Sequence, residues 1–157
     1  METRKRNRLK YWDYSRGGMY FITICTEGKK KILSEIVGAT SGRPLNVNLS
    51  EYGEIVENAI LDINKKYSII RVDKYVIMPN HIHLILVIDG VNWRAMHAPT
   101  ISKVIQQFKG VVTKQIGHSI FQRSFHDHII RNEQDYQHIW NYIDNNPLKW
   151  ELDCFYV

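Results

Sequence analysis

Two histidines one residue apart, His81 and His83, are the first residues of this sequence that could do chemistry. They open the run HIHLILVI, which is otherwise apolar. Successive side chains of a β-strand point to opposite faces, so both imidazoles share one face with Ile85 and Val87. Their Cα atoms are about 6.6 Å apart, which lets two ring nitrogens meet one divalent cation. The spacing indicates half of a metal site; the plain alternative is a pair of histidines bonded to backbone or water.

Two other histidine patterns compete with this interpretation. Three alternating histidines are typical of nucleotide hydrolases, but the third position here is Ile85, so that pattern fails. The run His126-Asp127-His128 also alternates and could supply ligands from another strand. The remaining histidines have no pattern around them and are interpreted as surface or loop residues: His97, His118 and His138.

A helix late in the chain offers groups that could complete the site. Asn132 can cap a helix that ends at Pro147. At 100° per residue, its buried face comprises Tyr136, Ile139, Trp140 and Ile143. Tyr142 and Asn146 lie four residues apart on its flank, where a phenol and an amide oxygen could present a nucleophile and a metal ligand together. Packing alone is the alternative for Tyr142. Because Asn146 precedes Pro147, we expect non-helical geometry there and a loosened register with Tyr142.

The remaining elements must position these side chains. Strands are predicted over Tyr20–Thr26, Ile69–Ile77, His81–Ile88 and Phe125–Arg131, with a turn at Pro79-Asn80. Ser50 can cap a helix with an apolar face of Tyr52, Ile55, Val56, Ala59, Ile60 and Ile63, and a second helix is predicted from about Ser102 to Ile116. This order predicts an α+β, ferredoxin-like (RRM-like) fold. We expect a mainly antiparallel sheet with helices packed on one face, and an extra C-terminal helix that bears the tyrosine.

Size and composition favour one soluble domain. The chain has 157 residues, of which 44% are hydrophobic and 24% charged, and shows no repeat, so we expect a single domain over residues 1–157. No apolar run approaches the roughly 20 residues of a membrane helix, and the basic start METRKRNRLK lacks the apolar stretch of a secretory signal. We therefore expect a cytoplasmic protein without a membrane partner. Cys25 and Cys154 form neither a CxxC pair nor a disulfide framework.

The net charge of +5 favours a polyanionic partner. Residues 1–10 form a basic N-terminal arm, followed by aromatic residues on which bases could stack. The helix over residues 102–116 carries three lysines outside its apolar face. We expect phosphate contacts from Arg4, Lys5, Arg6, Arg8, Lys103, Lys109 and Lys114. The alternative is an ordinary solvated surface.

Four stretches of the sequence together match a known family. They are YWDYSRGGMYFITICT, YVIMPNHIHLILVI, FQRSFHDHIIRNEQDY and YIDNNPLKWELD, and they span residues 11–153. The sequence resembles the single-tyrosine (Y1) HUH transposases, the IS200/IS605-like family that includes the REP-associated tyrosine transposases. The Met-Pro-Asn-His-x-His stretch combined with a late Tyr-x-x-x-Asn-Pro is highly specific for this resemblance.

The resemblance implies a role for each matching residue. His81 and His83 match the pair that binds the catalytic cation, Tyr142 matches the nucleophile, and Asn146 falls where relatives place a further polar metal ligand, often Gln. The implied cofactor is Mg²⁺ or Mn²⁺. Two imidazoles alone would favour Zn²⁺, but substrate phosphate oxygens would supply the hard ligands that the protein lacks.

The implied function is a metal-dependent tyrosine HUH endonuclease and transposase. Such an enzyme cleaves and rejoins single-stranded DNA next to hairpin (palindromic) DNA through a 5′-phosphotyrosine intermediate, without ATP. One alternative is a non-cleaving hairpin-DNA-binding regulatory module of the same fold, and another is a metal-dependent phosphohydrolase. A homodimer is common in the insertion-sequence branch, often with the tyrosine helix of one subunit completing the other's site, whereas the domesticated branch can act as a monomer. The sequence leaves both arrangements open.

Overall fold

The computed structural model describes residues 17–38, 46–90 and 100–157. Four strands form one antiparallel sheet in the order β4-β5-β1-β6. They are β1 (Gly18–Cys25), β4 (Ile70–Ile77), β5 (His81–Ile88) and β6 (His126–Ile130). Two helices, α1 (Glu51–Lys66) and α2 (Ile101–Ile116), complete the ferredoxin-like arrangement. The predicted fold class and these elements are confirmed. The predicted basic arm, with Arg4, Lys5, Arg6 and Arg8, lies outside the described residues.

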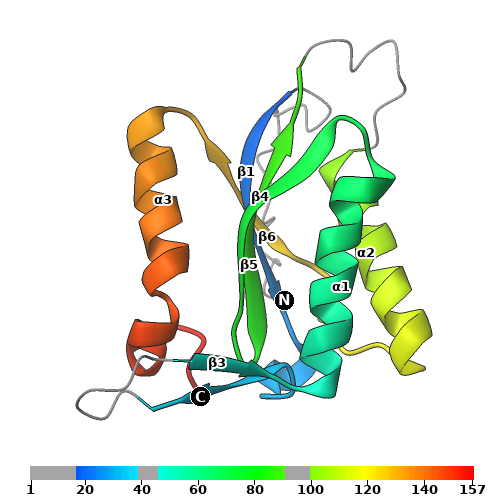
Figure 1. The fold of residues 1–157 in the computed structure, drawn as a ribbon, viewed down its shortest axis with the longest axis vertical. Coiled ribbons are helices and arrows are strands. Elements are labelled where there is room, and N and C mark those ends of the chain that lie inside the picture. The colour runs from blue at the N-terminus through cyan, green and yellow to red at the C-terminus, as the bar shows by residue number, and fades with distance from the viewer. Residues whose placement is uncertain (1–16, 39–45, 91–99) are drawn as a thin grey trace, which may run out of the picture.

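Both faces of the sheet are covered by helices (Figure 1). Helices α1 and α2 pack on one face, where the main core includes Ile82, Leu84 and Leu86 of β5. The extra helix, α3 (Glu133–Asn145), lies on the opposite face, where Ile139 and Ile143 join a smaller apolar cluster. The alternation along β5 therefore turns its histidines toward α3.

A short hairpin that was not predicted from the sequence lies between β1 and α1. Its strands are β2 (Ser34–Val37) and β3 (Asn46–Leu49), which pair antiparallel as a separate two-stranded sheet. Each strand has four residues and is mostly exposed or half-buried. Segments this short carry too few alternating residues to produce a recognisable strand pattern.

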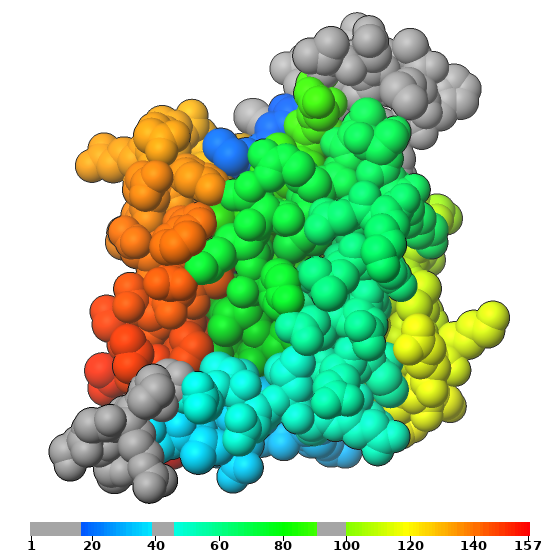
Figure 2. Space-filling model, in the orientation of Figure 1, coloured from blue at the N-terminus to red at the C-terminus, as the bar shows by residue number. Residues whose placement is uncertain are grey.

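Polar contacts hold α3 against the edge strand β4. The hydroxyl of Tyr136 donates a hydrogen bond to Asp73 Oδ2 over 2.5 Å. The ammonium of Lys74 lies 2.7 Å from Asp144 Oδ1 and 3.7 Å from the centre of the Trp140 ring. In the space-filling view, the orange and red surface of α3 adjoins the green surface of the sheet (Figure 2). These contacts fix the position of the tyrosine helix on the sheet of its own chain.

In the part of the chain that the structure describes, every helix is too short or too polar to span a bilayer.

Candidate active site

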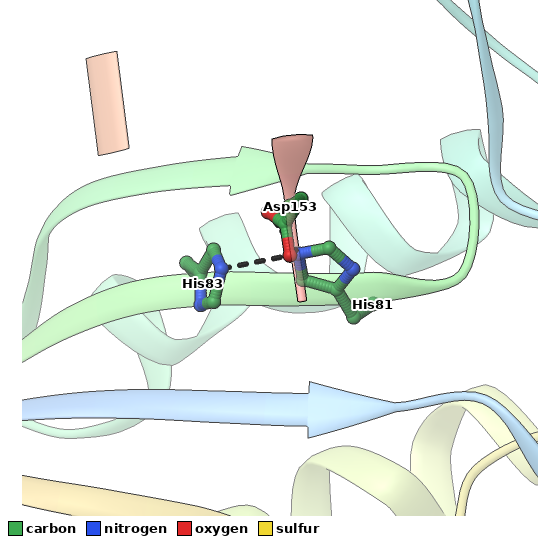
Figure 3. Close-up of side chains that lie close together, drawn as sticks. All are labelled: His81, His83 and Asp153. Carbon is green, nitrogen blue, oxygen red and sulfur yellow. Dashed lines mark hydrogen bonds and ion pairs between the residues drawn. The ribbon is translucent and has the colours of Figure 1, made fainter. Parts of the chain in front are cut away.

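The two histidines predicted from the sequence meet at the start of β5. His81 and His83 are both buried, with exposed fractions of 0% and 1%. Their Nε2 atoms lie 3.0 Å apart, so the two rings direct the same nitrogen toward a shared point (Figure 3). Two imidazoles therefore lie together at the buried start of one strand, as the two-residue repeat of side-chain direction along a strand predicted.

The Nδ1 atoms of both rings have buried partners. Nδ1 of His81 lies 2.8 Å from Oδ1 of Asn80, and Nδ1 of His83 lies 2.8 Å from Oγ1 of Thr23. Thr23 faces His83 in the register between β1 and β5. Hydrogen bonds at the second nitrogen are the usual way in which proteins orient metal-binding histidines.

Burial keeps both rings neutral at neutral pH. It lowers the pKa of His81 to about 4, against the opposing effect of the nearby Asp153 carboxylate. It also places the pKa of His83 well below the ordinary value of 6.5, and the adjacent His81 lowers it further. Because neutral imidazole has a lone pair, the site suits a cation without prior loss of a proton from either ring.

Asp153 joins the two histidines, although no sequence pattern predicted this. Its Oδ2 lies 3.8 Å from His81 Nε2, and its carboxylate is buried (Figure 3). The ligand atoms of His81, His83 and Asp153 all lie within 4.8 Å of one another. Because His81 is neutral, this contact is not an ion pair; it places a carboxylate oxygen beside two imidazole nitrogens. No other group of three or more His, Cys, Asp or Glu residues among the described residues could hold a metal ion.

Asn146 supplies a second oxygen at the same place. Its Nδ2 donates a hydrogen bond to Asp153 Oδ2 over 2.8 Å. Its Oδ1 is buried and has no hydrogen-bond partner among the residues that the structure describes. A buried acceptor without a partner is costly, and a cation held by His81 and His83 would satisfy it. Two imidazole nitrogens, a carboxylate and this amide oxygen together fit a divalent cation.

The expected loss of helical geometry before Pro147 is wrong. Asn146 has φ −58° and ψ −42°, which is right-handed helical backbone. The chain continues directly into a short 3-10 helix, η2 (Pro147–Leu152), whose first residue is the proline. Proline is well tolerated at the first position of a helix. Asn146 therefore keeps its register with Tyr142.

Tyr142 lies beside the histidines of its own chain. Its ring centre is 5.3 Å from that of His83 and 6.0 Å from that of Phe21. The residue is 39% exposed, so its surface remains open to a substrate. Partial burial raises the pKa of the Tyr142 phenol to about 12, and the negative charge of Asp153 acts in the same direction. The free phenol is thus protonated at neutral pH.

A cavity of about 480 Å³ opens next to this cluster. Its walls come from α3 and from the C-terminal segment. Tyr142, Asn146 and Asp153 contribute to its lining, together with His138, Asn141, Asn145 and Lys149. His138 was interpreted as a surface residue without a pattern; its exposed side chain lies at this cavity.

The predicted DNA-binding lysines lie on the other side of the sheet. Lys103, Lys109 and Lys114 belong to α2, which packs on the face opposite the histidines. Lys103 and Lys114 are exposed. The ammonium of Lys109 donates hydrogen bonds to the backbone carbonyls of residues 122–124, the shortest being 2.7 Å to Gln122. The structure brings none of these lysines to the histidine site.

The second histidine pattern stays apart from the first. His126 and His128 project from β6, which is separated from β5 by β1. His128 Nε2 lies 3.0 Å from Asp135 Oδ2 at the start of α3. His128 thus pairs with a surface carboxylate, and His126 is exposed.

Comparisons with known proteins agree with the fold. No family model matches the chain. An uncharacterized protein of Haemophilus influenzae is 33% identical, with the match covering 98% of this chain and 93% of that protein. A second protein of the same organism, named as a candidate REP-associated tyrosine transposase, is 27% identical over 87% of this chain and 74% of its own length.

Two solved structures share the fold. The structure of a REP-associated tyrosine transposase bound to a REP hairpin has a TM-score of 0.67 at 22% identity, covering 100% of this chain and 76% of that one. The crystal structure of a candidate transposase from Deinococcus radiodurans has a TM-score of 0.52 at 15% identity, covering 88% and 95%.

The sheet topology and the two solved structures place the chain in the class of proteins that share the fold of the tyrosine transposases. The chain is thus similar in sequence to a candidate REP-associated tyrosine transposase and shares the fold of a solved one.

Proposed function

We propose that this protein is a metal-dependent DNA strand transferase. It cleaves single-stranded DNA next to a hairpin and rejoins it through a 5′-phosphotyrosine intermediate. The observation that supports this most strongly is the position of Tyr142, whose ring lies 5.3 Å from that of the buried His83. A candidate nucleophile, two candidate nitrogen ligands and two candidate oxygen ligands thus gather within one chain, so one chain has the groups needed for the reaction.

Four side chains would hold the cation: His81, His83, Asp153 and Asn146. We take the ion to be Mg²⁺ or Mn²⁺, because the carboxylate and the amide oxygen add hard ligands to the two imidazoles. A bound divalent cation supplies Lewis-acid stabilisation of the charge that develops on the scissile phosphate.

Tyr142 performs the bond exchange. Its Oη forms a bond to phosphorus, the bond from phosphorus to the 3′ oxygen breaks, and the released strand ends in a 3′-OH. The phenol proton leaves to water, and the departing 3′ oxygen takes up a proton from water. The raised pKa of Tyr142, about 12, means that nearby positive charge must favour the phenolate during the attack. The reverse reaction, attack by a 3′-OH on the phosphotyrosine, rejoins DNA without ATP.

The cavity beside Tyr142 suits an unpaired strand. Its volume of about 480 Å³ lies in the range of small-ligand pockets. The amides of Asn141 and Asn145 can bond to base edges, and Lys149 can approach a phosphate. A duplex would keep its bases stacked and its phosphates away from such a cavity, which favours single-stranded DNA. We take the neighbouring hairpin as the partner because one structural relative is bound to a REP hairpin.

Denaturing electrophoresis tests the proposal. Labelled hairpin DNA with single-stranded flanks of randomised sequence is mixed with the full chain and Mn²⁺ or Mg²⁺. We expect a protein-linked band that disappears in Tyr142→Phe and persists in Tyr52→Phe, a matched control on α1 on the other face of the sheet. A band that survives Tyr142→Phe would contradict the assignment of the nucleophile.

The same experiment separates the enzyme from a non-cleaving module. A pure binder shifts the hairpin on a native gel but gives no covalent band with either cation. A phosphohydrolase gives shortened DNA without a covalent band. Only the strand transferase gives both a covalent band and, on addition of a 3′-OH strand, a rejoined product.

A further inference from the structure

The two imidazoles of the candidate site contact each other directly. His81 Nε2 and His83 Nε2 lie 3.0 Å apart and both rings are buried. Two neutral imidazoles form a hydrogen bond at this distance only when one Nε2 carries the proton and the other offers its lone pair. A cation requires both lone pairs. The free and the cation-bound site must therefore differ in the position of one proton.

Asn80 fixes the proton of His81. The Asn80 Nδ2 lies 2.7 Å from the backbone carbonyl of Phe155, so this end of the amide is the donor and Oδ1 is the atom 2.8 Å from His81 Nδ1. A carbonyl oxygen only accepts hydrogen bonds. His81 therefore carries its proton on Nδ1, and its Nε2 is unprotonated before any cation binds.

The proton between the rings then belongs to His83. With His81 Nε2 bare, the 3.0 Å contact is a hydrogen bond donated by His83 Nε2. Nδ1 of His83 is consequently unprotonated in the absence of a cation, and its partner at 2.8 Å is the hydroxyl of Thr23. A hydroxyl can donate to this nitrogen or accept from it, whereas Asn80 Oδ1 can do only one of these.

We propose that Thr23 is a positioning residue that lets His83 change tautomer when a cation binds. Without the cation, the Thr23 hydroxyl donates to Nδ1, and His83 donates from Nε2 to His81. With the cation, the proton lies on Nδ1 and is donated to Thr23, so both Nε2 atoms face the ion. One proton leaves Nε2 and one is added at Nδ1 of the same ring, so no proton is released overall. This inference rests on the cation site of the proposed function.

Variants at Thr23 separate the hydroxyl from the shape of the side chain. Thr23→Val keeps the shape and removes the hydroxyl. An imidazole that binds a cation is a stronger N–H donor than a free one. Loss of the Thr23 hydroxyl therefore destabilises the cation-bound state more than the cation-free state. We expect Mn²⁺ to bind Thr23→Val on the order of 10- to 100-fold more weakly and Thr23→Ser nearly as tightly as the unaltered protein. Ser34→Ala is the matched control, because Ser34 is also buried and its hydroxyl donates a hydrogen bond to the Ile77 carbonyl, away from the histidines.

Calorimetry with Mn²⁺ measures the affinities, and nitrogen NMR of the labelled histidine rings in the full chain measures the tautomers. In metal-free protein we expect the proton on Nδ1 of His81 and on Nε2 of His83. Addition of Zn²⁺ or Mg²⁺, which are diamagnetic, should move the His83 proton to Nδ1. The spectra need no substitution, so they test the inference even if Thr23→Val fails to fold.

Each contrary result has a distinct meaning. A His83 proton on Nδ1 before any cation is added, or unchanged Mn²⁺ affinity in folded Thr23→Val, overturns this inference alone. The proposed function would then still stand on the covalent adduct of Tyr142. Failure of the unaltered protein to bind Mn²⁺, Mg²⁺ or Zn²⁺ overturns both.

Discussion

Asn146 donates a hydrogen bond from Nδ2 to Asp153 Oδ2 over 2.8 Å, which joins the end of α3 to the turn that follows η2. The amide oxygen of Asn146 has no hydrogen-bond partner among the described residues, and the bond from Nδ2 holds the Asp153 carboxylate near His81. Both candidate oxygen ligands, Asn146 and Asp153, therefore depend on the helix that carries Tyr142. The positions of the candidate ligands and of Tyr142 are thus coupled through one helix end.

The first prediction concerns the charge of Asp153. In Asp153→Asn the shape is kept but the only acidic ligand of the cluster is lost, so we expect Mn²⁺ and Mg²⁺ affinity to fall on the order of 10- to 100-fold. Zn²⁺ should lose less, because nitrogen ligands contribute more to its binding. Calorimetry measures this, with Asp144→Asn as the control, since Asp144 is an exposed α3 carboxylate paired with Lys74. Equal losses for all three cations would argue against Asp153 as a hard ligand.

The second prediction concerns the ionisation of Tyr142. Because burial raises its pKa to about 12, only a small fraction is phenolate near neutral pH, and that fraction grows about tenfold per pH unit. At saturating Mn²⁺, single-turnover formation of the covalent adduct should accelerate as pH rises from about 6.5 to 8.5. Quenched-flow electrophoresis measures the rate. A rate independent of pH over this interval would mean that attack by the phenolate does not limit the reaction.

The third prediction concerns stability in acid. The unfolded histidines take up protons near the ordinary pKa of 6.5, whereas burial holds the pKa of His81 at about 4 and that of His83 well below 6.5. Their contribution to stability is therefore complete above pH 6.5 and is lost as pH falls from there toward about 4. Urea unfolding in the presence of a chelator should show this decline. The double variant His81→Gln/His83→Gln should flatten it, and the exposed-site control His118→Gln should not.

The fold was predictable because its main elements carry strong local patterns. The apolar face of α1, from Val56 to Ile63, is buried, and alternate residues of β5 lie on opposite faces of the sheet, both as expected. The hairpin of β2 and β3 was missed because its strands are short and half-exposed. Local patterns also cannot tell which face of a sheet a helix covers. The placement of α3 opposite α1 and α2 depends on its tertiary contacts, such as that of Tyr136 with Asp73.

The candidate site was only partly predictable. A period of two places His81 and His83 together, and a spacing of four places Tyr142 beside Asn146. Asp153 has no such spacing: it reaches the histidines only because the helix continues through Pro147 into η2 and the chain then turns back. The single available cue was an acidic residue soon after the Asn-Pro pair. The role of Thr23 could not be predicted for a related reason. Its contact with His83 arises from pairing between strands and joins residues 60 positions apart in the sequence.

The fourth prediction concerns the cavity beside Tyr142. If it holds the unpaired strand, Asn141→Ala and Asn145→Ala remove hydrogen bonds to that strand, each weakening binding by about 3- to 10-fold. Fluorescence anisotropy measures this with hairpin DNA that has single-stranded flanks, using Tyr142→Phe protein so that no cleavage occurs. A hairpin without flanks should bind each variant equally. Gln137→Ala is the matched control, because Gln137 is an exposed α3 amide that contacts Glu133 and does not line the cavity. Equal losses for hairpins with and without flanks would show that these asparagines contact the stem, and the unpaired strand would then have to follow another path to Tyr142.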